Sequence, residues 1–298
     1  MRYYYRSRAR PCARPNWCAD ESVDLIYLDP PFNSNCSYNV LFKAPTGEHS
    51  KAQIDAFEDT VRLAMPEIGL FDAIYSARAL RRLKPDPVPE EIITRILDAA
   101  IRAPSAGNTQ NWAFIVVRDG EQRRRLGMIY RKASDIASEM YKARGRPAHV
   151  TEEQYRRMMT SGAYLWDHMG EAPVLLVPCL QERATPTLPP SLDAMYEREL
   201  AYERRIRGAS IYPAVQNIIL ACRAFGLGTL ITTNHIRCED EVKALLGLPA
   251  DVSTYALMPI GYPQGKFGPL ARKPVSEVAY ADRWGVAWPT RFHPFQSA

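Results

Sequence analysis

The sequence lacks the features that mark several common protein classes. No apolar run approaches the roughly 18 residues that a membrane-spanning helix needs, and no signal-peptide core follows the N-terminus. The six cysteines form no C-x-x-C pair, and none has a histidine at zinc-finger spacing. We therefore predict a cytoplasmic protein with free thiols, no membrane partner and no metal site.

Acidic residues are missing from the first 14 positions, and this absence explains the net charge. The five arginines of that stretch carry +5, the formal net charge of the whole chain. The remaining 33 basic residues balance 33 acidic residues. The basic character belongs to a short tail, so we expect no nucleic-acid partner.

Two motifs of enzyme chemistry are also absent. No G-x-G-x-x-G joins a strand to a helix, which leaves a Rossmann dinucleotide site unsupported. The five histidines are scattered and form no Ser/His/Asp set. Among them, only His235 follows a candidate ligand-binding strand end, so no catalytic residue is predicted on the protein itself.

From about residue 66 the hydrophobic pattern is regular and alternates between helix and strand periods. The predicted helices cover 70–83, a segment from 89 to 100, 121–144, 151–168, 209–225 and 239–247. The predicted strands cover 113–117, 173–177, 229–232 and 253–260. We predict an N-terminal extension over 1–65 and one α+β domain over 66–298, with a loop or lid at 181–195 and a C-terminal arm after Gly261.

Four segments of the larger part carry unusual side chains. Arg78, Arg81 and Arg82 would share one face of the first helix. This cluster is either a phosphate-binding site or a basic helix face exposed to solvent. The loop 103–112 is rich in small and amide residues, which suits a planar ligand or a plain connection. The other two are the strand end at 226–234 and the segment 258–263 followed by Arg272, and each also has an ordinary structural interpretation.

Together these segments resemble the nitroreductase family of FMN-dependent oxidoreductases over roughly residues 70–290. The motifs are Arg78 to Pro89, the Ala-Pro-Ser-x-x-Asn-x-Gln-x-Trp loop, Gln216-Asn217 with Gly226-Leu227-Gly228, and Pro-Ile-Gly-Tyr-Pro at 259–263. The resemblance implies a three-layer fold, with a mostly antiparallel central sheet flanked by helices. It also implies an intertwined homodimer with FMN at the subunit interface.

The resemblance further implies which residues bind FMN. The phosphate would be held by the early and late arginines, the ring would lie along the Pro-Ser loop, and the strand end would stack near the reactive ring. The implied cofactor-binding residues are Arg78, Ala79, Leu80, Arg81, Arg82, Pro104, Ser105, Ala106, Asn108, Gln110, Leu230, Ile231, Thr232, Thr233 and Arg272.

Some positions depart from the family pattern. Ala77-Arg78-Ala79 stands where Arg-Arg-Ser is frequent, so a guanidinium and a hydroxyl are missing. Asn111 stands where proline is common, and Leu270 where some members carry lysine. These departures concern phosphate affinity and the choice of substrate rather than the fold.

The implied activity is electron transfer from NADH or NADPH, through the flavin, to nitroaromatic, quinone or related aromatic acceptors by a ping-pong mechanism. A positive group near the flavin N1–C2 carbonyl edge would stabilise the reduced form, and Arg81 or Arg82 is the candidate. The alternative within the family is another reaction on the same fold, namely reductive dehalogenation or flavin breakdown.

Residues 15–60 resemble a different family. Asp29-Pro30-Pro31-Phe32 looks like the catalytic tetrad of DNA amino-methyltransferases, which stacks on a flipped base. The Gly-rich loop that would bind S-adenosylmethionine is absent, and about 45 residues are too few to enclose both sites. We therefore interpret this stretch as a non-functional remnant, with DNA methylation as the minor alternative.

Overall fold

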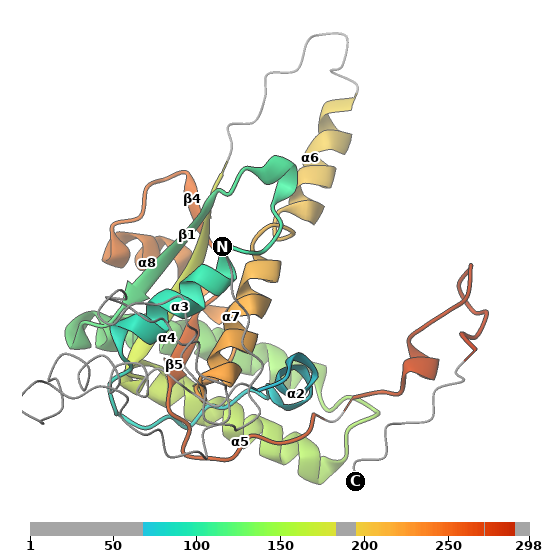
Figure 1. Ribbon diagram of the computed structural model, residues 1–298, viewed down its shortest axis with the longest axis horizontal. Helices are drawn as coiled ribbons and strands as arrows, with labels where there is room; N and C mark the ends of the chain where they lie inside the picture. Colours follow the sequence, from blue (N-terminus) through green and yellow to red (C-terminus); the bar gives the residue numbers. More distant parts are fainter. Residues whose placement is uncertain (1–67, 183–194, 271, 290–298) are drawn as a thin grey trace, which may run out of the picture. The chain divides into compact units, whose positions relative to one another are not determined.

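The computed structural model describes residues 68–182, 195–270 and 272–289 (Figure 1). The predicted N-terminal extension and nearly all of the predicted 181–195 loop lie outside the described residues. The boundary at residue 65 therefore stays a prediction. Within the described part, no helix is both long and apolar enough to cross a lipid bilayer.

A five-stranded sheet forms the centre of the domain, in the order β1-β2-β5-β3, with β4 beside the far end of β2. The strands are β1 Trp112–Val117, β2 Val174–Gln181, β3 Gly228–Thr229, β4 Val252–Thr254 and β5 Met258–Gly261. Every strand pair in the described chain is antiparallel. β2 is central and buried along all but its last residue, which explains its continuous apolar sequence.

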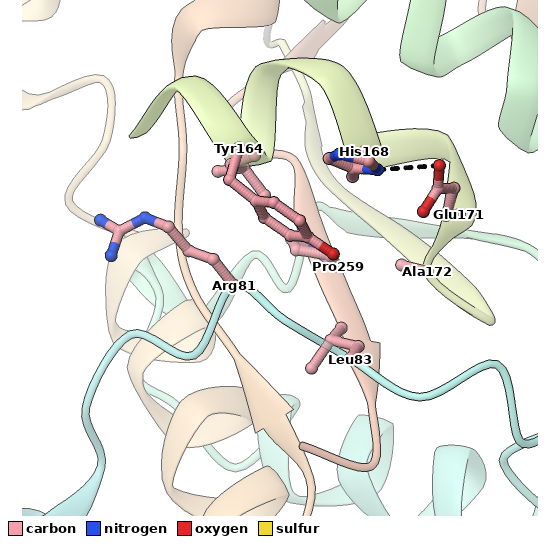
Figure 2. Close-up of a pocket in the computed structure, with 8 residues that line it drawn as sticks. Arg81, Leu83, Tyr164, His168, Glu171, Ala172 and Pro259 are labelled. Atoms are coloured by element: carbon pink, nitrogen blue, oxygen red, sulfur yellow. Dashed lines mark hydrogen bonds and ion pairs between the residues drawn. The ribbon is translucent and has the colours of Figure 1, made fainter. Parts of the chain in front are cut away.

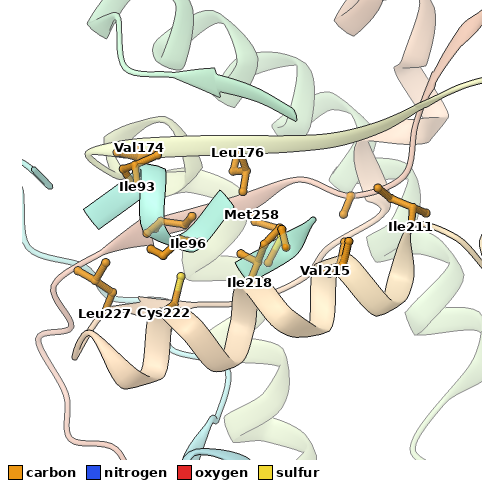
Figure 3. Packing of buried hydrophobic residues seen from close by; sticks show 14 of the residues in the cluster. Ile93, Ile96, Val174, Leu176, Ile211, Val215, Ile218, Cys222, Leu227 and Met258 are labelled. Atoms are coloured by element: carbon orange, nitrogen blue, oxygen red, sulfur yellow. The ribbon is translucent and has the colours of Figure 1, made fainter. Parts of the chain in front are cut away.

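Helices α3 (Glu90–Ala100) and α7 (Tyr212–Ala224) cover one face of the sheet. Ile93 and Ile96 of α3 meet Ile218 of α7 in an apolar layer that also includes the sheet residue Met258 (Figure 3). The apolar stripe predicted for α3 is confirmed.

Helices α4 (Gly120–Arg144), α5 (Glu152–His168) and α8 (Glu239–Leu246) belong to the other side. Leu126 of α4, Leu165 of α5 and Val242 of α8 pack in one cluster with β2. The three-layer arrangement implied by the family resemblance is therefore confirmed. The remaining elements are α2 Leu70–Ser76, α6 Tyr196–Ile206, and the short 3-10 turns Ala106–Asn108, Met169–Glu171, Asn234–Cys238 and Val275–Glu277.

Two of the predicted strands, 229–232 and 253–260, are longer than the strands that form. The segment 253–260 forms two strands because the register changes between them. The three residues 255–257 lie opposite only two residues of β2, Val177 and Pro178. This extra residue acts as a β-bulge, and Pro178 has no N–H with which to continue the ladder. The predicted strand 229–232 shrinks to β3, although Thr232 forms an isolated bridge with Leu257.

Candidate functional site

The helix predicted over 70–83 ends at Ser76, so the arginines that follow are not on a helix. Residues 77–84 run extended along the sheet edge, where Leu80 N–H donates to the Thr229 carbonyl at 3.3 Å. Lys84 N–H donates to the Tyr262 carbonyl at 2.7 Å. Pairing with the open edge of the sheet outweighs the helical pattern, and the proline after Lys84 favours an extended chain.

The three arginines of this segment consequently differ in their exposure and in their contacts. Arg78 is exposed, whereas Arg81 is half-buried, and its Nη1 donates to Ser161 Oγ at 3.3 Å. Arg82 turns toward α5 and stacks over the Tyr164 ring, with 3.8 Å between its guanidinium carbon and the ring centroid. The prediction that Arg78 and Arg82 share one helix face is wrong.

Arg78 nevertheless lies close enough to Arg81 to influence the pKa of Arg81. Burial lowers the pKa of Arg81, and the nearby Arg78 guanidinium lowers it further, while Tyr130 raises it. Neither arginine forms an ion pair with any residue that the structure describes. Two neighbouring guanidinium groups without a carboxylate are suited to binding an anion.

Tyr164 and His168 of α5 and the following Glu171 form a row of side chains beside the same segment. Tyr164 stacks on His168 with ring centroids 4.1 Å apart, and His168 Nδ1 lies 2.9 Å from Glu171 Oε1. Figure 2 shows this row beside a hollow that Arg81 and Pro259 also line. The Arg81 guanidinium extends away from this row of side chains (Figure 2), and its Nη1 donates to Ser161 Oγ.

The segment after β5 returns to the end of α2. Leu270 N–H donates to the Tyr75 carbonyl at 3.2 Å, and a Cβ added at Gly268 would lie 3.7 Å from Arg78 Nη1. Arg272, two residues after Leu270, is exposed. The chain segments that lead to the early and late arginines of the predicted phosphate site therefore meet at the end of α2.

The strand end after β3 alternates between buried and exposed positions. Leu230 is buried, Ile231 is 40% exposed, and Thr233 is exposed. Thr232 exchanges backbone hydrogen bonds with Leu257 at 3.2 and 2.8 Å. Its hydroxyl lies 3.1 Å from the Tyr130 hydroxyl of α4, a residue that the sequence analysis missed. The sequence signal that could have identified Tyr130 was a tyrosine among the apolar residues on the buried face of α4.

The predicted ring-binding loop, 103–112, has a strained but well-connected backbone. Gly107, Asn108 and Gln110 adopt positive φ angles of 59°, 51° and 50°. Such angles are unfavourable for residues with a Cβ, and they persist only where surrounding bonds enforce them. Here the Gln110 N–H donates to Ser105 Oγ at 3.0 Å.

The loop is tied to two other parts of the chain. Ala106 N–H donates to Ser210 Oγ at 3.1 Å, and Trp112 Nε1 donates to the Ser210 carbonyl at 2.6 Å. Pro104, Ala106, Asn108 and Gln110 are exposed and Ser105 is half-buried, so the loop offers a polar surface. Asn111, which stands where proline is common, donates through Nδ2 to the Gln181 carbonyl at 2.6 Å.

The sheet register separates this loop from the arginine segment. Trp112, at the end of the loop, pairs with Leu180 of β2, while Ile260 pairs with Val174, six residues away. Leu83 pairs still further along, with Pro263. At about 3.3 Å per residue the two groups lie about 20 Å or more apart along one chain.

His235, the histidine nearest the strand end, is fully buried and not available to a ligand at the surface. Burial lowers its pKa to about 4, and neither ring nitrogen has a hydrogen-bond partner among the described residues. The described residues also hold no cluster of His, Cys, Asp and Glu that could bind a metal ion.

Comparisons with known proteins place these features in a family context. A family model described as "Nitroreductase family" matches residues 74–262. The chain is 31% identical over 216 residues to an NADH dehydrogenase of Thermus thermophilus, covering 72% of this chain and 96% of that one. It is 26% identical over 223 residues to iodotyrosine deiodinase 1 of Rattus norvegicus, covering 74% of this chain and 71% of the relative.

Two solved structures share the fold. One is a BluB-like flavoprotein from Clostridium difficile 630, with a TM-score of 0.56 and 24% identity over 72% of this chain and all of that chain. Another is an iodotyrosine deiodinase bound to FMN and 3-iodo-L-tyrosine, with a TM-score of 0.51 and 24% identity over 69% of this chain and 96% of that chain.

The family match covers one of the two resemblances found in the sequence. The match begins at residue 74, and the methyltransferase interpretation of residues 15–60 is not borne out. It includes the arginine segment, the loop 103–112, the strand end and β5, all of which carried the first resemblance. It also spans well over half of the chain. The chain belongs to the nitroreductase family.

Proposed function

We propose that this chain is an FMN-dependent oxidoreductase that passes electrons from NADH or NADPH to a nitroaromatic, quinone or related aromatic acceptor. The observation that carries the proposal is the arginine pair. Arg78 and Arg81 approach each other without a carboxylate from the described chain, beside a strand end that presents Thr232 and Thr233. Family membership and an NADH dehydrogenase relative support the same activity.

The donor set fits a flavin mononucleotide. A phosphate needs guanidinium or backbone N–H donors, and Arg78 with Arg272 supplies exposed guanidinium groups near one end of α2. Arg81 is half-buried, so its charge interacts more strongly with a neighbouring anion than an exposed arginine would. We assign Arg78 and Arg272 to the phosphate and Arg81 to the electron-rich edge of the ring.

FMN, when bound, supplies hydride and electron transfer, which no protein side chain provides. The chain's own residues bind and orient it. Leu230 and Ile231 would offer backbone and apolar surface to the ring, and Thr232 and Thr233 would offer hydroxyl groups. Arg81 would stabilise negative charge on the reduced ring, as an oxyanion-type donor does.

The site needs two copies of the chain. The loop 103–112 and the arginine segment lie at opposite ends of β2, too far apart for the loop and Arg81 to contact the same flavin ring within one subunit. A second copy could bring its loop to the arginines. In support, α2 exposes Leu70, Phe71 and Tyr75 at 64%, 67% and 64%, and Trp284 of the C-terminal segment is 86% exposed. Such apolar surface is typical of subunit interfaces.

Reductive dehalogenation is the second candidate for the same site. Iodotyrosine deiodinases are among the relatives, at 25–27% identity. Both candidates share the flavin site and differ in the acceptor.

The test begins with purified protein reconstituted with FMN. A flavin absorbance band that survives gel filtration and bleaches anaerobically with NADH or NADPH supports the proposal. Reoxidation is then followed with a nitrobenzoate, a quinone and an iodotyrosine, which separates the two candidates. Arg78→Ala should weaken FMN binding at least tenfold, because a charged hydrogen bond of about 1.5–3 kcal/mol is lost.

The matched control is Arg124→Ala, which removes an exposed arginine on α4 that pairs with Glu121. It should bind FMN like the wild type. A wild-type protein that remains colourless after incubation with excess FMN overturns the proposed function.

A further inference from the structure

Tyr130 is a buried polar residue that forms a hydrogen bond with one of the predicted flavin-binding segments, the strand end after β3. It lies on α4 with 1% of its surface exposed, among the buried residues Leu126, Ala133 and Ala137 of the same helix. Its hydroxyl is 3.1 Å from Thr232 Oγ1, 102 residues away in sequence. A buried phenol group needs such a partner, because an unsatisfied hydroxyl in an apolar layer is costly.

Other groups around the Tyr130 hydroxyl influence its protonation. Burial raises the pKa of Tyr130, while the side chains of Thr232, Ser134 and Asn234 and the charge of Arg81 oppose the rise. Tyr130 therefore stays protonated at neutral pH and can donate.

The backbone of Thr232 is fixed independently of Tyr130. Its N–H and carbonyl are both bonded to Leu257, so what remains adjustable is the rotation of its side chain. The Asn234 N–H approaches Thr232 Oγ1 at 3.5 Å. In the hydrogen bond between the Tyr130 and Thr232 hydroxyls either oxygen can donate, and in both cases the bond restricts the rotation of the Thr232 side chain.

We propose that Tyr130 is a positioning residue, which holds the Thr232 hydroxyl in the orientation that it presents to the bound flavin. This inference rests on the proposed function. Tyr130 acts through Thr232 and not by touching the cofactor. Its loss would alter how the flavin is held and how readily it is reduced, without removing any direct contact to it.

The test is a double-mutant cycle with Tyr130→Phe, Thr232→Val and both together. Each single variant should weaken FMN binding about fivefold, equivalent to one hydrogen bond, and should shift the reduction potential and visible spectrum of the bound flavin. The double variant should change no more than the larger single one, because both substitutions break the same hydrogen bond. Thr232→Ser keeps the hydroxyl and should retain wild-type values.

Tyr255→Phe is the matched control. Tyr255 is 7% exposed, and its hydroxyl has no partner within the described chain. The same loss of a buried tyrosine hydroxyl should therefore leave the flavin potential and spectrum unchanged. If Tyr130→Phe lowers stability too far, Tyr130→3-fluorotyrosine keeps the hydroxyl as a stronger donor and should shift the potential without loss of fold.

The outcomes separate the two proposals. If the wild type binds FMN but Tyr130→Phe and the fluorotyrosine variant both leave its affinity, potential and spectrum unchanged, the positioning role is wrong and the proposed function stands. Additive effects in the double variant also overturn it. A wild type that binds no FMN overturns both.

Discussion

Asn111 illustrates how one side chain can fix the shape of a loop. Its Nδ2 bonds the Gln181 carbonyl, and its Oδ1 accepts from the Thr109 hydroxyl at 3.1 Å. A proline at this position could do neither. The departure from the family pattern therefore replaces a rigid ring with a pair of hydrogen bonds that join the loop to the end of β2.

We expect Asn111→Ala to leave the domain folded and to loosen the loop 103–112. Losing these bonds should lower the free energy of unfolding by about 1 kcal/mol and should weaken FMN binding severalfold. Urea denaturation and FMN titration measure the two effects. Lys142→Ala, which breaks only an exposed ion pair with Glu139, should leave both values within error.

His235 makes stability depend on pH in a predictable direction. Its pKa is about 4 in the folded protein and about 6.5 when unfolded, so the unfolded chain binds the proton more readily between these values. Stability is therefore lost as the pH falls through 6.5 toward 4. Between pH 7 and pH 5 this group alone should cost about 2 kcal/mol.

Chemical denaturation at pH 7 and pH 5, at one protein concentration, measures this dependence. His235→Leu should remove about 2 kcal/mol of the difference between the two pH values. His149→Gln changes an exposed histidine and should leave the difference intact. An identical pH dependence in His235→Leu and the wild type would contradict the prediction.

Among the secondary-structure elements, the extended segment 77–84 shows the limit of sequence reasoning. Its leucines and arginines have helical spacing, and α2 does begin where the pattern begins. The open edges of β3 and the segment after β5 then capture the backbone of Leu80 and Lys84. That edge is assembled from residues about 150 positions later, so no local pattern could reveal it.

Close packing at Gly228 allows this segment to reach the sheet. A Cβ there would lie 2.9 Å from Leu83 Cδ2 and 3.1 Å from Leu80 Cβ. We expect Gly228→Ala to push the segment outward, to cost about 1–3 kcal/mol of stability, and to weaken FMN binding through Arg81.

Thermal denaturation and FMN titration test the Gly228 prediction. Gly265→Ala is the control, since nothing lies within 4 Å of its added Cβ and the residue is exposed. Equal effects of the two substitutions would show that the approach of the segment to β3 is not tight.

Elements with strong periodicity were predictable, and those shaped by distant contacts were not. The apolar face of α3 and the long amphipathic α4 and α5 follow directly from the sequence. The bulge opposite Pro178 depends on how β4 and β5 meet β2, which local sequence does not specify. In the same way, the candidate site residues were identifiable by type, whereas their directions and the contact with Tyr130 required the fold.

On the scale of the whole molecule, the layered architecture explains why the candidate binding residues lie at strand ends and in loops. The face covered by α3 and α7 and the face covered by α4 and α8 are both filled with apolar side chains. Polar groups are left to the ends of strands and to the loops. The arginine segment and the loop 103–112 therefore occupy opposite ends of β2, where a ligand can reach them.

If two copies of the chain build the site as proposed, this separation has a genetic consequence. Variants should fall into two complementation groups, one defective in the arginine segment and the other in the loop. Arg81→Ala and Asn108→Val, which places a β-branched residue at a positive φ angle, should each abolish FMN binding. Co-expressed in equal amounts, they should recover about one quarter of the wild-type sites, because each mixed dimer contains one site built from two intact halves. No recovery would mean that both groups act within one subunit.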